Sequence, residues 1–119
     1  MQAQRKLLSK LLQLLQLRMQ QAGLWQVSPP AATAFSSQEP FCVDTMALEQ
    51  WLKHLFIPRM QAILDAEAPL PSACSLTPQV EMQLDHSSQA LVSEVTLAID
   101  LLLTEGKVPA ASLLKQAGG

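Results

Sequence analysis

Few residues of this 119-residue chain have the types and the spacing that a chemical reaction needs. Nucleophilic catalysis requires a Ser, Thr or Cys within hydrogen-bond reach of a base that a third group orients. The two histidines, His54 and His86, lie in no such arrangement, and no HxxxH or ExxH spacing offers a metal site. We therefore expect no catalytic residue, no metal and no cofactor, and a chain that is not an enzyme.

Arg59 is the charged residue with the strongest case for a binding role. It follows Pro58 in the apolar run Ile57-Pro58-Arg59-Met60, and a proline inside a helix removes a backbone donor at a cost of roughly 3 kcal/mol. A bend there would fix the guanidinium, which could bind a carboxylate or a phosphate. The alternative is a pair with Asp44 or another internal acid that locks the bend. A small-molecule enzyme that uses His54, Asp44 and Arg59 is a further alternative, and it requires a pocket that joins them.

Aromatic residues occur around the same segment. Phe35 and Phe41 precede the helix expected over residues 45–66, and Trp51 lies within that helix. Aromatic and Arg side chains supply much of the binding energy of protein interfaces. The sequence therefore predicts a partner-binding surface formed by Phe35, Phe41, Asp44, Trp51, Pro58 and Arg59.

The charge of the chain is distributed unevenly. Residues 1–38 contain four basic residues and no acidic one, whereas residues 39–119 contain all ten acids and four basic residues. Lys6 and Lys10 are expected on the polar face of the first helix, where they could contact RNA phosphates with an affinity that falls steeply with salt. The plainer explanation is a solvated basic face, because surface charge alone specifies little.

The apolar residues recur with helical spacing, and Leu and Ala outnumber the β-branched residues. We predict an all-α fold, a small up-and-down bundle of about four helices whose second helix is kinked or broken at Pro58. The preceding Ile57 is expected outside the α region, because a proline disfavours helical geometry in its neighbour. Arg18 falls within the apolar face of the first helix, where we expect it to reach water. The expected helices cover residues 3–22, 45–66, 78–84 and 88–104, with a terminal turn over 109–116.

The length predicts a single domain over residues 1–119, with a core of about 5–104 and a C-terminal extension over 105–119. No run approaches the roughly 18 apolar residues of a membrane span, and we expect a cytoplasmic protein. Cys42 and Cys74 suit a reducing compartment, although the sequence leaves a bridge between them open. A homodimer in which the wide leucine faces pair across two chains is a further possibility.

Several short motifs follow one another in an order and spacing that a known family shares. The chain contains Phe35-Ser36, Glu39-Pro40-Phe41, Asp44-Thr45-Met46, Trp51-Leu52, Ile57-Pro58-Arg59-Met60, Pro69-Leu70-Pro71 and Glu81-Met82. On these motifs, and over about residues 5–103, it resembles the YqcC-like family of small bacterial proteins. It departs from the family at Gln79-Val80, where relatives tend to be aromatic, and the tail from Gly106 looks like an extension.

The resemblance implies an all-helical bundle with no established enzymatic activity. The family is associated with a tRNA pseudouridine synthase, whose gene is often a neighbour. Such enzymes resemble large α/β proteins with a catalytic Asp, whereas this chain is short and has no Tyr to stack a base. We therefore expect a non-catalytic accessory protein whose partner is a tRNA pseudouridine synthase and whose contact with tRNA is indirect.

Overall fold

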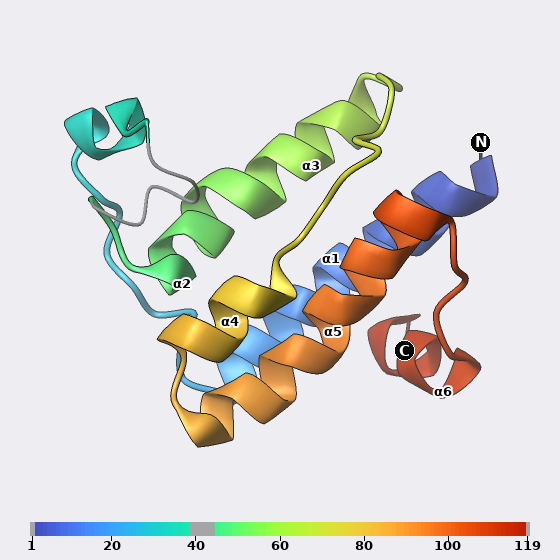
Figure 1. Ribbon diagram of the computed structural model, residues 1–119. Helices are drawn as coiled ribbons and strands as arrows, with labels where there is room; N and C mark the ends of the chain where they lie inside the picture. The colour runs from blue at the N-terminus through green and yellow to red at the C-terminus, as the bar shows by residue number, and fades with distance from the viewer. Residues whose placement is uncertain (1, 39–44, 119) are drawn as a thin grey trace.

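Helices form the regular structure of the chain (Figure 1). The structure, a computed structural model, describes residues 2–38 and 45–118, and no strand occurs within these ranges. The all-α fold predicted from the sequence is confirmed. The elements are α1 (Gln2–Gln21), the 3₁₀ helix η1 (Ala32–Ser36), α2 (Leu48–Trp51), the π-helical turn η3 (Leu52–Phe56), α3 (Ile57–Asp65), α4 (Thr77–Gln83), α5 (His86–Glu105) and α6 (Ala111–Gly118).

Helix α1 is the element around which the other long helices pack. It contacts α3, α5 and α6, and Figure 1 shows α1 and α5 side by side with opposite directions. The apolar face predicted for this helix is buried, and each such leucine contributes roughly 1.5–3 kcal/mol when it leaves water. The buried side chains of α1 in this core are Leu8, Leu11, Leu12, Leu14, Leu15 and Met19.

The ends of the two long helices follow the local sequence. Helix α1 is followed by Gly23 with a φ of 74°, and the Leu24 N–H donates to the Met19 carbonyl at 2.8 Å. This left-handed ending favours glycine, which has no Cβ. Helix α5 begins after Asp85, whose carboxylate accepts the Ser88 N–H at 2.9 Å, and ends at Gly106 with a φ of 70°. The hydrogen bond from the Ser88 N–H lowers the pKa of Asp85.

The prediction that Arg18 reaches water is wrong. Its side chain is buried, with 7% of the residue exposed, and it joins α1 to α5 and α6. The guanidinium donates to the Leu91 carbonyl at 2.8 Å, to Glu94 Oε1 at 2.7 Å and to Gln116 Oε1 at 2.8 Å. A buried cation is tolerated in an apolar face when its donors are satisfied in this way.

The terminal turn expected over residues 109–116 is a complete helix of eight residues, α6. It packs against α1, and Leu113 joins the main hydrophobic core. Together with the bond between Arg18 and Gln116, this contact ties the end of the chain to its first helix.

The helix that contains Pro58 continues through the proline. Its interruption lies one turn earlier, in η3, where the Ile57 N–H donates to the Leu52 carbonyl five residues before it. Ile57 has helical φ and ψ of −61° and −48°, so the expectation that it leaves the α region is wrong. In a regular helix the ring of Pro58 would collide with the His54 carbonyl, and we infer that the wider π-helical turn relieves this contact.

The same helix starts later than predicted, at Leu48. The side chain of Gln50 accepts the Ala47 N–H at 2.9 Å and so supplies the first cap. Thr45, where the helix was expected to begin, donates its hydroxyl to the Ala34 carbonyl at 2.7 Å.

The buried Arg18 gives a stability test. Arg18→Ala removes three hydrogen bonds and leaves a void, so we expect a loss of about 2–4 kcal/mol in the free energy of unfolding. Glu94 is the matched control, because its side chain is 58% exposed and Glu94→Ala leaves Arg18 two acceptors. We expect that control to lose at most about 1 kcal/mol. Urea denaturation of both variants measures the difference, and equal losses would contradict this assignment.

Candidate functional site

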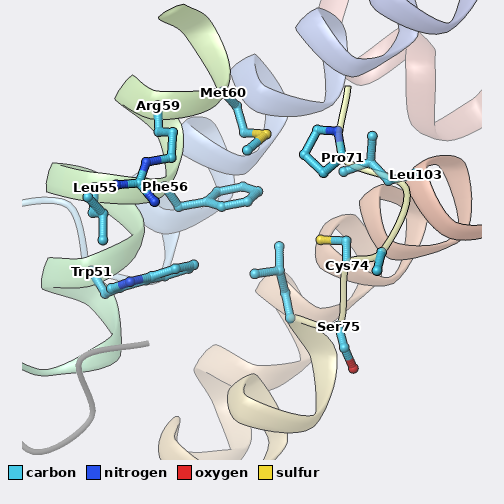
Figure 2. Close-up of a pocket in the computed structure, with 11 residues that line it drawn as sticks. Trp51, Leu55, Phe56, Arg59, Met60, Pro71, Cys74, Ser75 and Leu103 are labelled. Atoms are coloured by element: carbon cyan, nitrogen blue, oxygen red, sulfur yellow. The ribbon is translucent and has the colours of Figure 1, made fainter. Parts of the chain in front are cut away.

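A cavity of about 230 Å³ lies between the helical segment α2–α3 and the extended chain that leads into α4 (Figure 2). Segments far apart in the sequence form it, since the helix supplies one wall and residues 71–76, with the end of α5, supply the other. The side chains around it are mostly apolar. The lining residues are Trp51, Leu55, Phe56, Arg59, Met60, Pro71, Ala73, Cys74, Ser75, Leu76 and Leu103.

Two stacked aromatic rings form the helical wall. The ring centroids of Trp51 and Phe56 lie 5.4 Å apart with 25° between the ring planes, and Figure 2 shows both rings directed toward the opposite wall. In a regular α-helix, residues five apart lie about 140° apart around the axis. The π-helical turn, whose hydrogen bonds join residues five apart, brings the two rings onto one face. The irregular turn therefore builds this wall.

The opposite wall is held by a buried carboxylate on α5. Asp100, 8% exposed, accepts the N–H groups of Leu76 at 2.8 Å and Thr77 at 2.9 Å. It also accepts the Thr77 hydroxyl at 2.8 Å. These three donors offset the cost of removing the carboxylate from water. They fix the point at which the extended chain turns into α4.

Thr104, about one helical turn after Asp100 on α5, holds the same wall. Its hydroxyl accepts the Cys74 N–H and donates to the Cys74 carbonyl, each at 3.2 Å. Burial raises the pKa of the Cys74 thiol to about 12, and the nearby Asp100 acts in the same direction. The thiol that lines the cavity is therefore protonated and uncharged at physiological pH.

Arg59 is the one charged residue among the described residues that line the cavity. It is exposed, and Figure 2 shows its side chain running along the helix toward Leu55 and Phe56. Within residues 2–38 and 45–118 the ion pair present joins Arg18 and Glu94, and Arg59 makes none. The internal pair with Asp44 that the sequence left open involves a residue outside the described ranges.

The structure brings some of the predicted surface residues together. Trp51 and Arg59 line the same cavity, and the exposed Pro58 lies next to Arg59 without lining it. Phe35 is exposed on η1, and its neighbour Ala34 forms with Met46 a small apolar cluster against which Trp51 packs. Phe41 and Asp44 lie outside the described residues.

His54 belongs to a different set of contacts. Its Nε2 lies 3.5 Å from the Val27 carbonyl, while Lys53 donates to the Trp25 carbonyl at 2.6 Å and Gln50 donates to the Ser28 carbonyl at 3.1 Å. Side chains of α2 and η3 thus hold the segment that follows α1. His54 does not line the cavity of Arg59, so this cavity is not the pocket that a small-molecule enzyme using both residues requires.

The lysines proposed for RNA lie elsewhere. Lys6 and Lys10 are exposed on α1, and neither lines the cavity. Among the residues that the structure describes, no group of three or more His, Cys, Asp or Glu could hold a metal ion. None of the described helices is long and apolar enough to cross a membrane.

Sequence reasoning missed the second wall of the cavity. Pro71, Cys74 and Leu76 belong to a segment without helical periodicity, and the hydrogen-bond partners of Cys74 and Leu76 lie on α5. The motif Pro69-Leu70-Pro71 was the available signal, since it predicts extended chain directly after a helix. It did not indicate which helix that chain would face.

A comparison with protein families identifies the family of this chain. The model of the family DUF446, described as tRNA pseudouridine synthase C, matches residues 7–102. The chain belongs to the DUF446 family. The match includes both walls of the cavity except Leu103 and ends before α6.

The relatives and a solved structure agree with this placement, and the resemblance to YqcC is confirmed. An uncharacterized protein of Haemophilus influenzae is 53% identical over 70 residues, which span 59% of this chain and 66% of that protein. YqcC of Escherichia coli, also uncharacterized, is 35% identical over 96 residues, 79% of this chain and 88% of YqcC. The solution NMR structure of E. coli YqcC has a TM-score of 0.74 at 31% identity and covers 91% of this chain and 92% of that chain.

One relative of the DUF446 chain is much longer. A protein of Pectobacterium carotovorum named tRNA pseudouridine synthase C is 51% identical over 53 residues, 44% of this chain. These residues make up 14% of the Pectobacterium protein. The similarity to that named protein is thus confined to a small part of it.

The state of the cavity thiol can be measured directly. In a Cys42→Ser variant, Cys74 is the single cysteine. A pKa of about 12 in place of 9.0 lowers the thiolate fraction at pH 8, so we expect iodoacetamide to modify Cys74 about a thousandfold more slowly than an ordinary thiol. Mass spectrometry follows the reaction, and the same variant in guanidinium chloride is the control. Native and denatured rates within tenfold of each other would contradict the burial of this group.

Proposed function

We propose that this chain is a non-catalytic helical accessory protein that binds a tRNA pseudouridine synthase through the cavity beside Arg59. The observation that carries the proposal is an open, mostly apolar cavity walled by Trp51 and Phe56, with an exposed arginine on its lining. Trp and Arg are enriched among the residues that dominate binding energy at protein interfaces. An apolar hollow at the surface beside such residues is typical of a site that a partner covers.

The choice of partner is supported by the Pectobacterium protein. Its segment similar to this chain is 14% of its length, so a DUF446 segment and a much longer stretch of sequence are joined in one protein that is named tRNA pseudouridine synthase C. We assign the activity in that name to the remaining length. Two functions that occur in one chain are good candidates for partners when they occur in separate chains.

The chemistry of the cavity supports a binding role over a catalytic one. Its polar side-chain groups are the Arg59 guanidinium, the Trp51 indole N–H, the Ser75 hydroxyl and the Cys74 thiol, whose raised pKa keeps it protonated. A general base must accept a proton at the working pH, and the buried thiol of Cys74 already carries its proton there. We place this accessory function in the cytoplasm, where a tRNA-modifying enzyme would meet its substrate.

Direct RNA binding is the second candidate. Lys6 and Lys10 are both exposed, and neither makes an ion pair with the described residues. In a complex with the synthase, these charges could contact the phosphates of a bound tRNA. Phosphate contacts release counterions, so binding that depends on them weakens steeply as salt rises.

Co-purification tests the proposed function. The tagged chain, expressed in its native cells, is expected to retain the synthase, and Arg59→Ala is expected to retain less than about a tenth as much. Lys10→Ala is the matched control, because it also removes one exposed cation and lies outside the cavity. It should retain the synthase as the unchanged chain does. The unfolding free energies of both variants should stay within about 0.5 kcal/mol of the original.

Other outcomes of the same experiment point elsewhere. Absence of the synthase from the unchanged chain contradicts the proposed partner. Loss of the synthase after nuclease treatment, or with Lys10→Ala, assigns the contact to RNA. Light scattering at two protein concentrations tests the homodimer, and a monomer at both removes it.

A further inference from the structure

We propose that the cavity receives one apolar side chain of the partner while Arg59 binds a carboxylate located within one or two residues of that side chain. This inference rests on the proposed function and specifies the chemistry that the site recognises. It follows from the size of the cavity, the character of its walls and the position of its one charged group.

The volume sets the size of the occupant. Cavities that hold cofactors and drug-sized ligands measure roughly 300–1,000 Å³. This one measures about 230 Å³ and is open to solvent. It is therefore matched to a single large side chain that enters from outside, with the rest of its protein remaining at the surface.

The walls set the polarity of the occupant. Met60, Leu76 and Leu103 are buried core residues, and the Trp51–Phe56 stack completes an apolar lining. Cys74 adds a protonated thiol. A charged or strongly polar group inside this space would lose its hydration without gaining enough partners, whereas an aliphatic or aromatic group gains contacts and leaves water.

The positive charge of Arg59 indicates which group of the partner lies beside the apolar side chain. Arg59 makes no ion pair with the described residues, and no acid of the described chain lines the cavity with it. Its planar guanidinium matches a carboxylate in a two-point hydrogen-bonded pair. A partner with an acidic residue beside its apolar anchor is therefore complementary in both shape and charge.

A nucleotide fits this site less well, although Arg59 could also bind a phosphate. The rings of Trp51 and Phe56 stack on each other, so the faces they share are not available to a base. The hydroxyl of Ser75 and the thiol of Cys74 offer few groups to read a base edge. Residues 39–119 also contain ten acids and four basic residues, which repel a polyanion.

Small probes test the site without the synthase. The intact chain, labelled with ¹⁵N, is titrated with N-acetyl-Leu-Glu-amide, and the indole N–H signal of Trp51 is followed by NMR, with Trp25→Phe used to assign it. We expect saturable binding. N-acetyl-Ala-Glu-amide should bind about tenfold more weakly, because most of the buried apolar group is missing. N-acetyl-Leu-Gln-amide should bind about two- to fivefold more weakly, the range for an exposed ion pair.

Two variants link these effects to the cavity. Arg59→Gln should abolish the preference for Glu over Gln and keep the preference for Leu over Ala. Ala73→Trp places a large ring in the opening from an exposed position and should abolish binding of every probe. Ala111→Trp, at a position on α6 that is also exposed and lies outside the cavity, is its matched control and should bind as the unchanged chain does.

Each contrary result overturns the inference in a recognisable way. Equal affinities for the three peptides, or no binding, exclude a partner segment in which an acidic residue lies beside an apolar anchor. Tighter binding of uridine 5′-monophosphate assigns the site to nucleotides, and a Trp51 signal that changes with protein concentration alone assigns it to a second copy of the chain. A chain that retains the synthase but fails these titrations keeps the proposed function and loses this inference. If the chain binds the probe but does not retain the synthase, the chemistry inferred for the cavity stands and the proposed partner is contradicted.

Discussion

The candidate site depends on the hydrogen bonds that the carboxylate of Asp100 accepts. This carboxylate lies on a helix that packs against α1, and it accepts three hydrogen bonds from Leu76 and Thr77, at the point where extended chain becomes α4. A buried carboxylate is costly in water-free surroundings unless its oxygens are satisfied, so the extended chain and α5 hold each other in one arrangement. Thr104 of α5 fixes the same extended chain through two hydrogen bonds with the backbone of Cys74. One wall of the cavity is thereby positioned by the core.

The second wall depends on a local backbone irregularity. Pro58 lacks an N–H, and the π-helical turn before it allows the helix to continue from Leu48 to Asp65. The same turn brings Trp51 and Phe56 onto one face, where their rings stack. A feature that relieves a clash with proline thus also builds an aromatic surface. This link between the backbone and the cavity explains why Arg59, one residue after the proline, lies at its rim.

The sequence predicted the parts of the molecule that local rules determine. The leucine face of α1 and the extents of α1 and α5, each predicted to within two residues at either end, follow from periodicity. Trp51 and Arg59 were also expected on one surface, and they line one cavity. The parts that depend on distant contacts were missed. The cavity wall at Cys74 to Thr77 is fixed by α5 residues 23–30 positions away, and Arg18 is buried because α5 and α6 supply its acceptors.

We propose that the partner covers the cavity between α3 and the extended chain. Amide hydrogen exchange of the chain, measured alone and with the synthase bound, tests it most directly. We expect slowed exchange on binding to be concentrated in residues 51–60 and 71–76, with little change in residues 2–12 of α1. Slowed exchange confined to α1 around Lys6 and Lys10, with residues 51–60 and 71–76 unchanged, would contradict it.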